Sequence, residues 1–157
     1  MTNPRTGYPE GYLIYLVKQI EMGIRRPFED LIAGYGISTA GYTALTVLQN
    51  RPGITSSELA RRSFVRAQTM AETVTALTDA GLVRREKDPG HGRQILLHIT
   101  GEGLERVADL SADVTSLESQ MLENLTDNEP AELIRALRAC RDALSMTSRD
   151  ERPAPSA

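Results

Sequence analysis

Apolar residues recur at every third or fourth position along most of the chain, the spacing that gathers them on one face of a helix. The first such segment runs from Leu13 to Ile32 and is followed by Gly34. Pro27 lies inside this segment, and a proline removes one backbone hydrogen bond from a helix interior. We therefore predict an N-terminal helix that bends or restarts at Pro27.

Two further helices are predicted before residue 63. The first follows Ser38 and stops at the turn-forming sequence Asn50-Arg51-Pro52-Gly53. The second begins at Thr55, because Glu58 stands three residues later and can reach back to the cap, which is the pattern of a capping box. This helix is short and closes near Arg62.

A fourth helix is predicted from about residue 66 to residue 80, and Gly81 ends it. Its inward-facing residues are Met70, Val74 and Leu77. The period then becomes that of strands: Leu82–Lys87 and Gln94–Ile99 are short extended runs on either side of a glycine-rich segment. These runs predict a β-hairpin with a flexible tip.

The helical pattern returns after Thr100, with apolar positions alternately three and four residues apart, as in the seam between packed helices. These positions are Val107, Leu110, Val114, Leu117 and Met121. A last helix, near residues 130–145, carries a second seam of Leu133, Leu137, Cys140 and Leu144. The flanking helices have more apolar surface than the small central region can cover, which predicts a partner chain.

A helix-turn-helix followed by a hairpin is the element order of a winged helix. The predicted fold is mainly α with a small β-hairpin wing: a winged helix-turn-helix DNA-binding lobe plus N- and C-terminal dimerisation helices. The expected divisions are a flexible tail (1–8), a dimerisation helix (9–36), the DNA-binding lobe (37–99), dimerisation helices (100–147) and a second flexible tail (148–157).

The net charge of −3 conceals a segregated distribution. Residues 1–54 have five Lys and Arg against four Asp and Glu, residues 55–98 have seven against five, and residues 99–157 have six against twelve. The predicted lobe is therefore mildly basic, and the acidity lies in the C-terminal third. No apolar run approaches the roughly 18 residues of a membrane helix, so we expect a cytoplasmic protein that does not enter membranes.

An enzyme is not expected, because no catalytic constellation assembles. His91 and His98 have no cysteine or carboxylate at metal-ligand spacing, no phosphate-binding glycine loop is present, and no nucleophile motif surrounds any serine. We expect neither a metal nor a cofactor. The single cysteine, Cys140, lies on an apolar seam, where a buried thiol behaves as a small inert hydrophobe, and this argues against peroxide sensing.

Several stretches, in this order and at these spacings, resemble the MarR-type (multiple antibiotic resistance regulator) winged-helix transcription regulators. The most specific are Gly53-Ile54-Thr55-Ser56-Ser57-Glu58-Leu59-Ala60-Arg61-Arg62, Ala80-Gly81-Leu82-Val83-Arg84-Arg85, Asp88-Pro89 and Ile99-Thr100. The resemblance covers about residues 12–144. It implies a homodimer whose terminal helices interlock and whose two lobes grip double-stranded DNA at a pseudo-palindromic operator, more often as a repressor than as an activator.

Helix geometry selects the residues of the fourth helix that face away from its core. If Met70 and Val74 are buried, a turn of 100° per residue places Gln68 and Glu72 on the opposite face. Gln68 can read adenine, Glu72 can accept from cytosine, and the methyl group of the neighbouring Thr69 can meet thymine. Arg66, just ahead, suits a phosphate.

Glu72 has a second interpretation. The family often has arginine at this position, so the helix carries less positive charge here than in many relatives. Glu72 could instead form an ion pair with Arg61, Arg62 or Arg66 and orient that arginine toward a phosphate.

The wing and the third helix supply further candidates. The family keeps an Asp-x-Arg motif at the wing tip, where this chain has His91-Gly92-Arg93, so Arg93 is expected in an A·T-rich minor groove or else solvated. Ser56 and Ser57 begin the third helix and either bind phosphate or act as caps. Arg61 and Arg84 are expected to contact the DNA backbone, where contacts position the protein.

Six of the seven aromatic residues lie within the first 42 positions. In the family, small phenolic or aromatic effectors often bind between the dimer helices and the DNA lobe, and Tyr12, Tyr15 and Tyr42 are our candidates for contacting one. The alternative is that these rings only pack at the dimer interface. A second reading of the whole chain also stays open: a winged helix used for protein–protein contact, without specific DNA binding.

Overall fold

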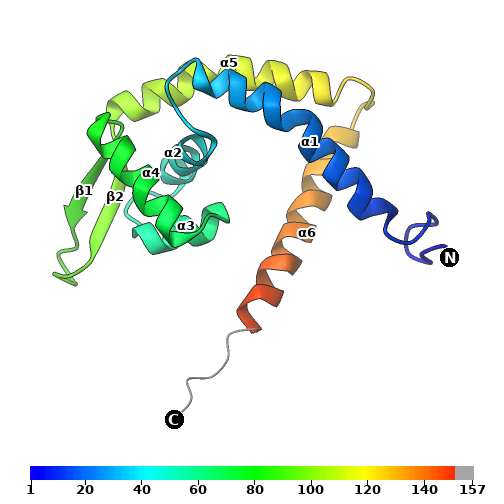
Figure 1. Ribbon diagram of the computed structural model, residues 1–157, viewed down its shortest axis with the longest axis horizontal. Helices are drawn as coiled ribbons and strands as arrows, with labels where there is room; N and C mark the ends of the chain where they lie inside the picture. Colours follow the sequence, from blue (N-terminus) through cyan, green and yellow to red (C-terminus); the bar gives the residue numbers. More distant parts are fainter. Residues whose placement is uncertain (151–157) are drawn as a thin grey trace, which may run out of the picture. The chain divides into compact units, whose positions relative to one another are not determined.

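The computed structural model describes residues 1–150, those from 145 onward by their backbone alone, and contains helices and one antiparallel hairpin (Figure 1). The elements are α1 (Tyr12–Ala33), α2 (Thr39–Asn50), α3 (Ser56–Ser63), α4 (Ala67–Asp79), β1 (Val83–Lys87), β2 (Ile95–Ile99), α5 (Gly101–Met121) and α6 (Glu129–Asp150). This order confirms the predicted fold class. Residues 1–117 form one compact unit, and the chain from Glu118 onward forms a second.

The starts of α2 and α3 are fixed by side-chain caps. The Ser38 hydroxyl accepts a hydrogen bond from the Gly41 N–H at 3.1 Å, and the Thr55 hydroxyl accepts one from the Glu58 N–H at 3.2 Å. Each bond satisfies one of the amide groups left unpaired in a first helical turn. The expected reciprocal half of the capping box is not formed, because the Glu58 carboxylate binds Arg61 and Arg62 instead.

Gly81 ends α4 as predicted, in the left-handed conformation at φ 75°. The Gly81 N–H donates to the Thr78 carbonyl, and the Leu82 N–H donates to the Leu77 carbonyl. This is the paired pattern of a Schellman motif, which saturates the last carbonyls of a helix. Leu77 and Leu82 are both buried, so the same turn directs the chain from α4 into β1 across the core.

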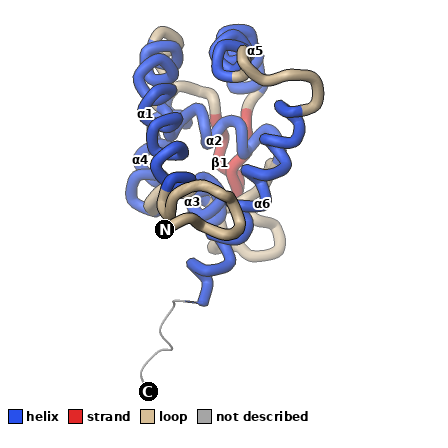
Figure 2. The backbone as a smooth tube through the Cα atoms, turned by 90° about the vertical axis from the view of Figure 1, so that its right-hand side faces the viewer, coloured by secondary structure: helices blue, strands red, loops and turns tan. Residues whose placement is uncertain are grey.

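The hairpin pairs Val83 with Ile99 and Lys87 with Ile95 in a regular antiparallel register, and a bridge between Ile54 and Leu97 adds a short third edge (Figure 2). The core of the lobe lies against it. Its fully buried side chains include Leu45, Leu48, Leu59, Met70, Val83, Leu97 and Leu110. The predicted inward face of α4 is confirmed, since Met70, Val74 and Leu77 are all buried.

Two features of the N-terminal part bear on what the sequence predicted. α1 does not restart at Pro27 but continues through it as one helix; the carbonyl that loses its partner belongs to Gly23, which is exposed and can bind water instead. The first residues, expected as a flexible tail, form a local turn in which the Asn3 N–H donates to the Tyr8 carbonyl at 2.8 Å and Thr2 bridges to Pro9.

The seam of α5 is partly buried within its own chain: Val107 and Leu110 are buried, whereas Met121 is exposed. α6 runs to Asp150, five residues beyond the predicted end, and the rest of the predicted C-terminal tail lies outside the described residues. The expectation of a buried Cys140 was wrong for the single chain, in which the thiol is exposed.

Candidate nucleic-acid interface

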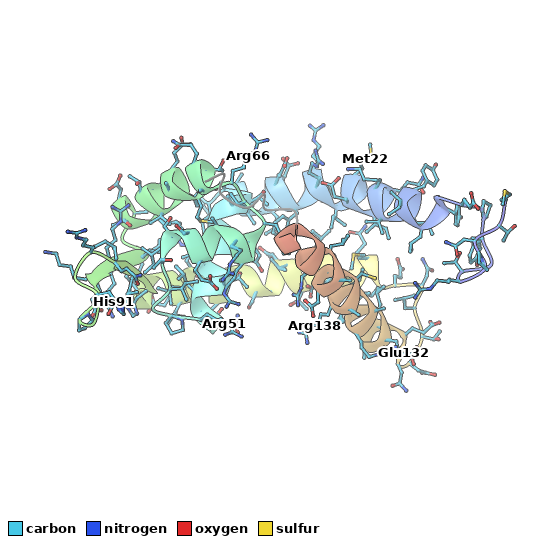
Figure 3. All side chains as sticks on the ribbon, turned by 90° about the horizontal axis from the view of Figure 1, so that it is seen from below. Met22, Arg51, Arg66, His91, Glu132 and Arg138 are labelled. Atoms are coloured by element: carbon cyan, nitrogen blue, oxygen red, sulfur yellow. The ribbon has the colours of Figure 1, made fainter. Side chains whose placement is uncertain are left out.

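The start of α4 presents a polar, exposed face opposite its buried one. Arg66 is the N-cap residue, and Arg66, Gln68, Thr69 and Glu72 are all exposed. Figure 3 places the labelled Arg66 at the beginning of this helix, on the outside of the lobe. The N-terminal turn of a recognition helix is the part that can reach base edges in a major groove, and here that turn is exposed to solvent.

Glu72 does not form the ion pair that is one of its two expected contacts. Its carboxylate Oε1 accepts a hydrogen bond from the Gln68 side-chain amide at 2.9 Å. Arg61 and Arg62, two of its three expected partners, are held by Glu58. Within residues 1–144, Glu72 therefore forms no ion pair, and its charge is compensated by one amide alone.

The arginines of this surface differ in their own partners. Arg61 and Arg62 bind the Glu58 carboxylate, and the hydrogen bond from Arg61 lowers the pKa of Glu58 below its ordinary value. Arg84 binds Glu86 in the same way and lowers the pKa of that carboxyl. By contrast, the side chains of Arg66 and Arg93 have no ion pair or hydrogen bond in the part of the chain whose side chains the structure describes.

The N-terminus of α3 offers a second polar point. Thr55 is the residue that caps it, so neither Ser56 nor Ser57 is needed for that purpose. Ser57 is exposed and Ser56 half-buried. Two hydroxyls beside the free amides of a first helical turn suit an anion such as a phosphate.

Asp88 organises the wing tip through contacts with Gly90 and His91. The Asp88 carboxylate accepts from the Gly90 N–H at 2.8 Å and lies 3.5 Å from His91 Nδ1. The His91 N–H in turn donates to the Asp88 carbonyl. His91 marks this tip in Figure 3, and Arg93 follows it, exposed, just before β2.

The candidate effector tyrosines fall into two separate groups in the single chain. Tyr12 packs against Tyr8 and Tyr15, with ring centroids 5.3 and 6.3 Å away. Tyr42 instead meets Phe28 edge to face, at 5.2 Å. Phe28 lies thirteen positions after Tyr15 on α1, or about 20 Å of helix at 1.5 Å per residue, so one chain does not bring the three tyrosines together.

The sequence did not predict the hydrogen bonds that Tyr35 forms with α5. The Tyr35 hydroxyl donates to the Asp113 carboxylate at 2.8 Å, which raises the pKa of the phenol, and Arg106 donates to the Tyr35 carbonyl at 2.6 Å. These bonds tie the segment after α1 to α5. Residues more than 70 positions apart carry no joint pattern in a single sequence, so no local signal could have found the contact.

No group of three or more His, Cys, Asp or Glu side chains among the described residues could hold a metal ion. None of the described helices is long and apolar enough to cross a bilayer.

Comparisons with known proteins decide the family. The sequence model of the MarR family matches residues 35–94, which cover the lobe from α2 through the wing tip and end just before β2. The HTH-type transcriptional repressor Rv2887 of Mycobacterium tuberculosis is 30% identical over 129 residues, covering 82% of this chain and 91% of that protein. The chain belongs to the MarR family.

Solved structures of MarR proteins agree with this assignment. A MarR protein from Peptoclostridium difficile superposes with a TM-score of 0.80 at 18% identity, covering 97% of this chain and 98% of the other. The PcaV transcriptional regulator of Streptomyces coelicolor, solved with its natural ligand, gives a TM-score of 0.64 at 25% identity, covering 92% and 98%. This MarR-family chain is thus a transcriptional regulator with a winged helix-turn-helix, from a family of regulators rather than of enzymes.

Proposed function

We propose that the chain is a homodimeric repressor that binds a pseudo-palindromic operator in double-stranded DNA, in the cytoplasm. One observation carries the proposal: the N-terminal turn of α4 exposes Arg66, Gln68 and Thr69 together, with the Arg66 guanidinium unpaired. A helix start with a free cation and two exposed hydrogen-bonding side chains fits a major groove. The repressor sense is supported by the name of the mycobacterial relative.

The candidate residues divide by chemistry into base readers and phosphate binders. Gln68 and Thr69 face outward on the recognition helix and are proposed to meet base edges. Glu72 beside them is proposed to act on a base either directly or through Gln68, and Arg93 is proposed to enter the minor groove from the wing. The proposed phosphate contacts are Ser56, Ser57, Arg61, Arg66 and Arg84. Because Arg61 and Arg84 must share their charge with Glu58 and Glu86, we expect them to contribute less than the unpaired Arg66.

Dimerisation is proposed through the flanking helices, residues 9–36 and 100–147, with residues 37–99 as the DNA-binding lobe. α1 leaves Leu13, Val17 and Ile20 about half exposed in the single chain. These residues are three or four positions apart and make one apolar face, which a second copy of the same helix could cover. Two lobes held in this way would meet half-sites about one helical turn apart.

A small aromatic effector is proposed as the signal that releases the DNA. Phe28 and Tyr42 form an edge-to-face pair where α1 meets α2, at the base of the lobe. Such a pair supplies an apolar wall with one hydroxyl, the usual lining of a small-molecule site. The solved PcaV structure contains that protein's natural ligand. In a dimer, Tyr12 and Tyr15 of the second copy could complete the wall.

The test begins by selecting tight binders from a pool of random duplexes and measuring their affinity across a salt series. Binding through Z phosphates gives a log–log slope near −0.9Z for duplex DNA. Arg93→Ala is expected to weaken binding most on operators with A·T pairs at the wing position, and Arg66→Ala about equally on every sequence. Lys18→Ala, on the exposed part of α1, removes a charge outside the lobe and serves as the control.

Two results would contradict the proposal. Failure to enrich any sequence, together with a flat salt response, would leave the winged helix as a protein–protein module. Equal loss on all sequences from Arg93→Ala would make Arg93 a phosphate contact and remove the minor-groove assignment.

A further inference from the structure

Gln68 and Glu72 lie one turn apart on the exposed face of α4 and are joined by a hydrogen bond of 2.9 Å. The bond has a defined direction. An ionised carboxylate has only acceptor atoms, whereas a glutamine amide has an oxygen that accepts and a nitrogen that donates. The Gln68 nitrogen must therefore face Glu72, because turning the amide over would set one oxygen against another.

This bond determines what Gln68 can offer to a base. The terminal torsion of a free glutamine is broad and roughly two-fold, so either the oxygen or the nitrogen of the amide can face a given neighbour. With one N–H committed to Glu72, the side chain presents its carbonyl oxygen and its remaining N–H. An adjacent acceptor and donor is the pair that matches N6 and N7 of adenine in the major groove.

Other polar side chains around Glu72 already have partners of their own. The nearby Arg61 and Arg62 are engaged by Glu58, and the Thr75 hydroxyl, next along the exposed face, is used by Ala71 and Arg85. Glu72 therefore places a negative charge, which no cation within residues 1–144 pairs with, on a face proposed to approach phosphates. A negative charge there lowers the affinity of the protein for every DNA sequence alike. The benefit that Glu72 can offer in exchange is sequence specificity.

We infer that Glu72 is a specificity-determining positioning residue, which holds the Gln68 amide in the orientation that reads adenine. This inference rests on the proposed function and adds to it the base read by each half-site. It assigns Glu72 an indirect role, acting through Gln68, in place of a direct contact with cytosine.

The experiment measures binding to four duplexes that differ only at the base pair whose preference Gln68→Ala reduces most. The wild-type dimer is expected to prefer adenine there by about five- to 150-fold, the range given by one bidentate contact. Glu72→Ala should reduce this preference several-fold while tightening binding to all four duplexes. Glu72→Gln removes the same charge but keeps an acceptor, so it should tighten binding equally and retain more of the preference.

The double variant separates positioning from direct reading. In the Gln68→Ala background, Glu72→Ala should shift all four affinities together and leave their ratios unchanged. Asp79→Ala removes an exposed carboxylate from the other end of α4 and is the matched control, expected to leave the wild-type preference intact. Alanine favours helix, so these variants should keep the fold, which circular dichroism checks.

Two outcomes would overturn the inference. If Glu72→Ala alters the preference as strongly without Gln68 as with it, Glu72 reads the base itself. If it tightens binding without changing the preference, the residue acts by charge alone. A wild-type protein that selects no duplex at all would instead count against the proposed function, so the two failures are distinguishable.

Discussion

The buried apolar side chains of the described residues all lie between Ile32 and Leu110, whereas the first half of α1 exposes a row of large ones. Leu45 in the lobe is fully buried, while Leu13 and Ile20 on α1 are 55% and 52% exposed. The contrast occurs even within α1, since Phe28, Leu31 and Ile32 at its end join the core of the lobe. The lobe satisfies its apolar residues internally, and the rest of α1 has an exposed apolar face, which we propose a second chain covers.

The largest expected effect comes from opening the core of the lobe. Leu45→Ala should lower the free energy of unfolding by about 2–5 kcal/mol, the cost of the lost burial and of the cavity that remains. Urea unfolding followed by circular dichroism measures it. Leu13→Ala is the matched change on α1. Any loss that it causes should vary with protein concentration, because it would arise from association, whereas the loss from Leu45→Ala should appear at every concentration.

Gly103, near the start of α5, tests how closely the lobe is packed. A Cβ at this position would collide with the Leu82 carbonyl oxygen and would lie 2.7 Å from Ile99 Cγ1. Gly103→Ala should therefore destabilise the chain by about 1–3 kcal/mol, although alanine is otherwise the better helix former. Gly92→Ala on the wing, where no atom lies within 4 Å of the added carbon, should leave the unfolding free energy nearly unchanged. A stabilising Gly103→Ala would show that the helix start can shift at little cost.

Local chemistry made much of the lobe predictable from the sequence. Caps and stops depend on a few neighbouring residues, so Thr55 and Gly81 marked the start of α3 and the end of α4 correctly. The inward face of α4 followed from helical period alone. The alternative of a restart at Pro27 did not occur, because the cost of a proline depends on whether the freed carbonyl can bind water, which sequence does not reveal.

The partners of the charged side chains were harder to predict. Glu58 had several cations and a backbone amide within reach, and it took Arg61 and Arg62 rather than the cap. Long charged side chains can reach several neighbours in conformations of nearly equal energy. The sequence therefore allowed three arginines as ion-pair partners of Glu72. The actual partner, Gln68, was the uncharged residue one turn earlier on the same helix. Whether the candidate residues contact DNA stays a prediction.

The exposed face of α1 can be tested by a change of intermediate size. Ile20→Ala removes three carbons from this face, or about 2 kcal/mol per chain if a second copy buries them, which is more than a tenfold weaker dimer. Sedimentation equilibrium over a range of protein concentrations measures the dissociation constant. Met22→Ala is the control. Met22 is 69% exposed and stands two residues, or 200°, around the helix from Ile20 (Figure 3). Equal weakening by both variants would mean that the face is not the dimer surface.

The smallest expected effect on stability comes from the ion pairs that Glu58 forms with Arg61 and Arg62, on the proposed DNA-binding side of the lobe. Arg61 lowers the pKa of Glu58 in the folded chain below 4.5, the value for the unfolded chain. The ion pairs therefore stabilise the fold fully at pH values above 4.5. This stabilisation is lost as the pH falls through the lower pKa of the folded chain. Glu58→Gln should then cost less than about 1 kcal/mol at neutral pH, since the pairs are partly solvated, and progressively less below pH 4.5. Urea unfolding of both proteins across this pH range measures the difference, with Glu105→Gln on the exposed side of α5 as the control. A difference that stays constant with pH would mean that Glu58 stabilises α3 through its helical position and not through its charge.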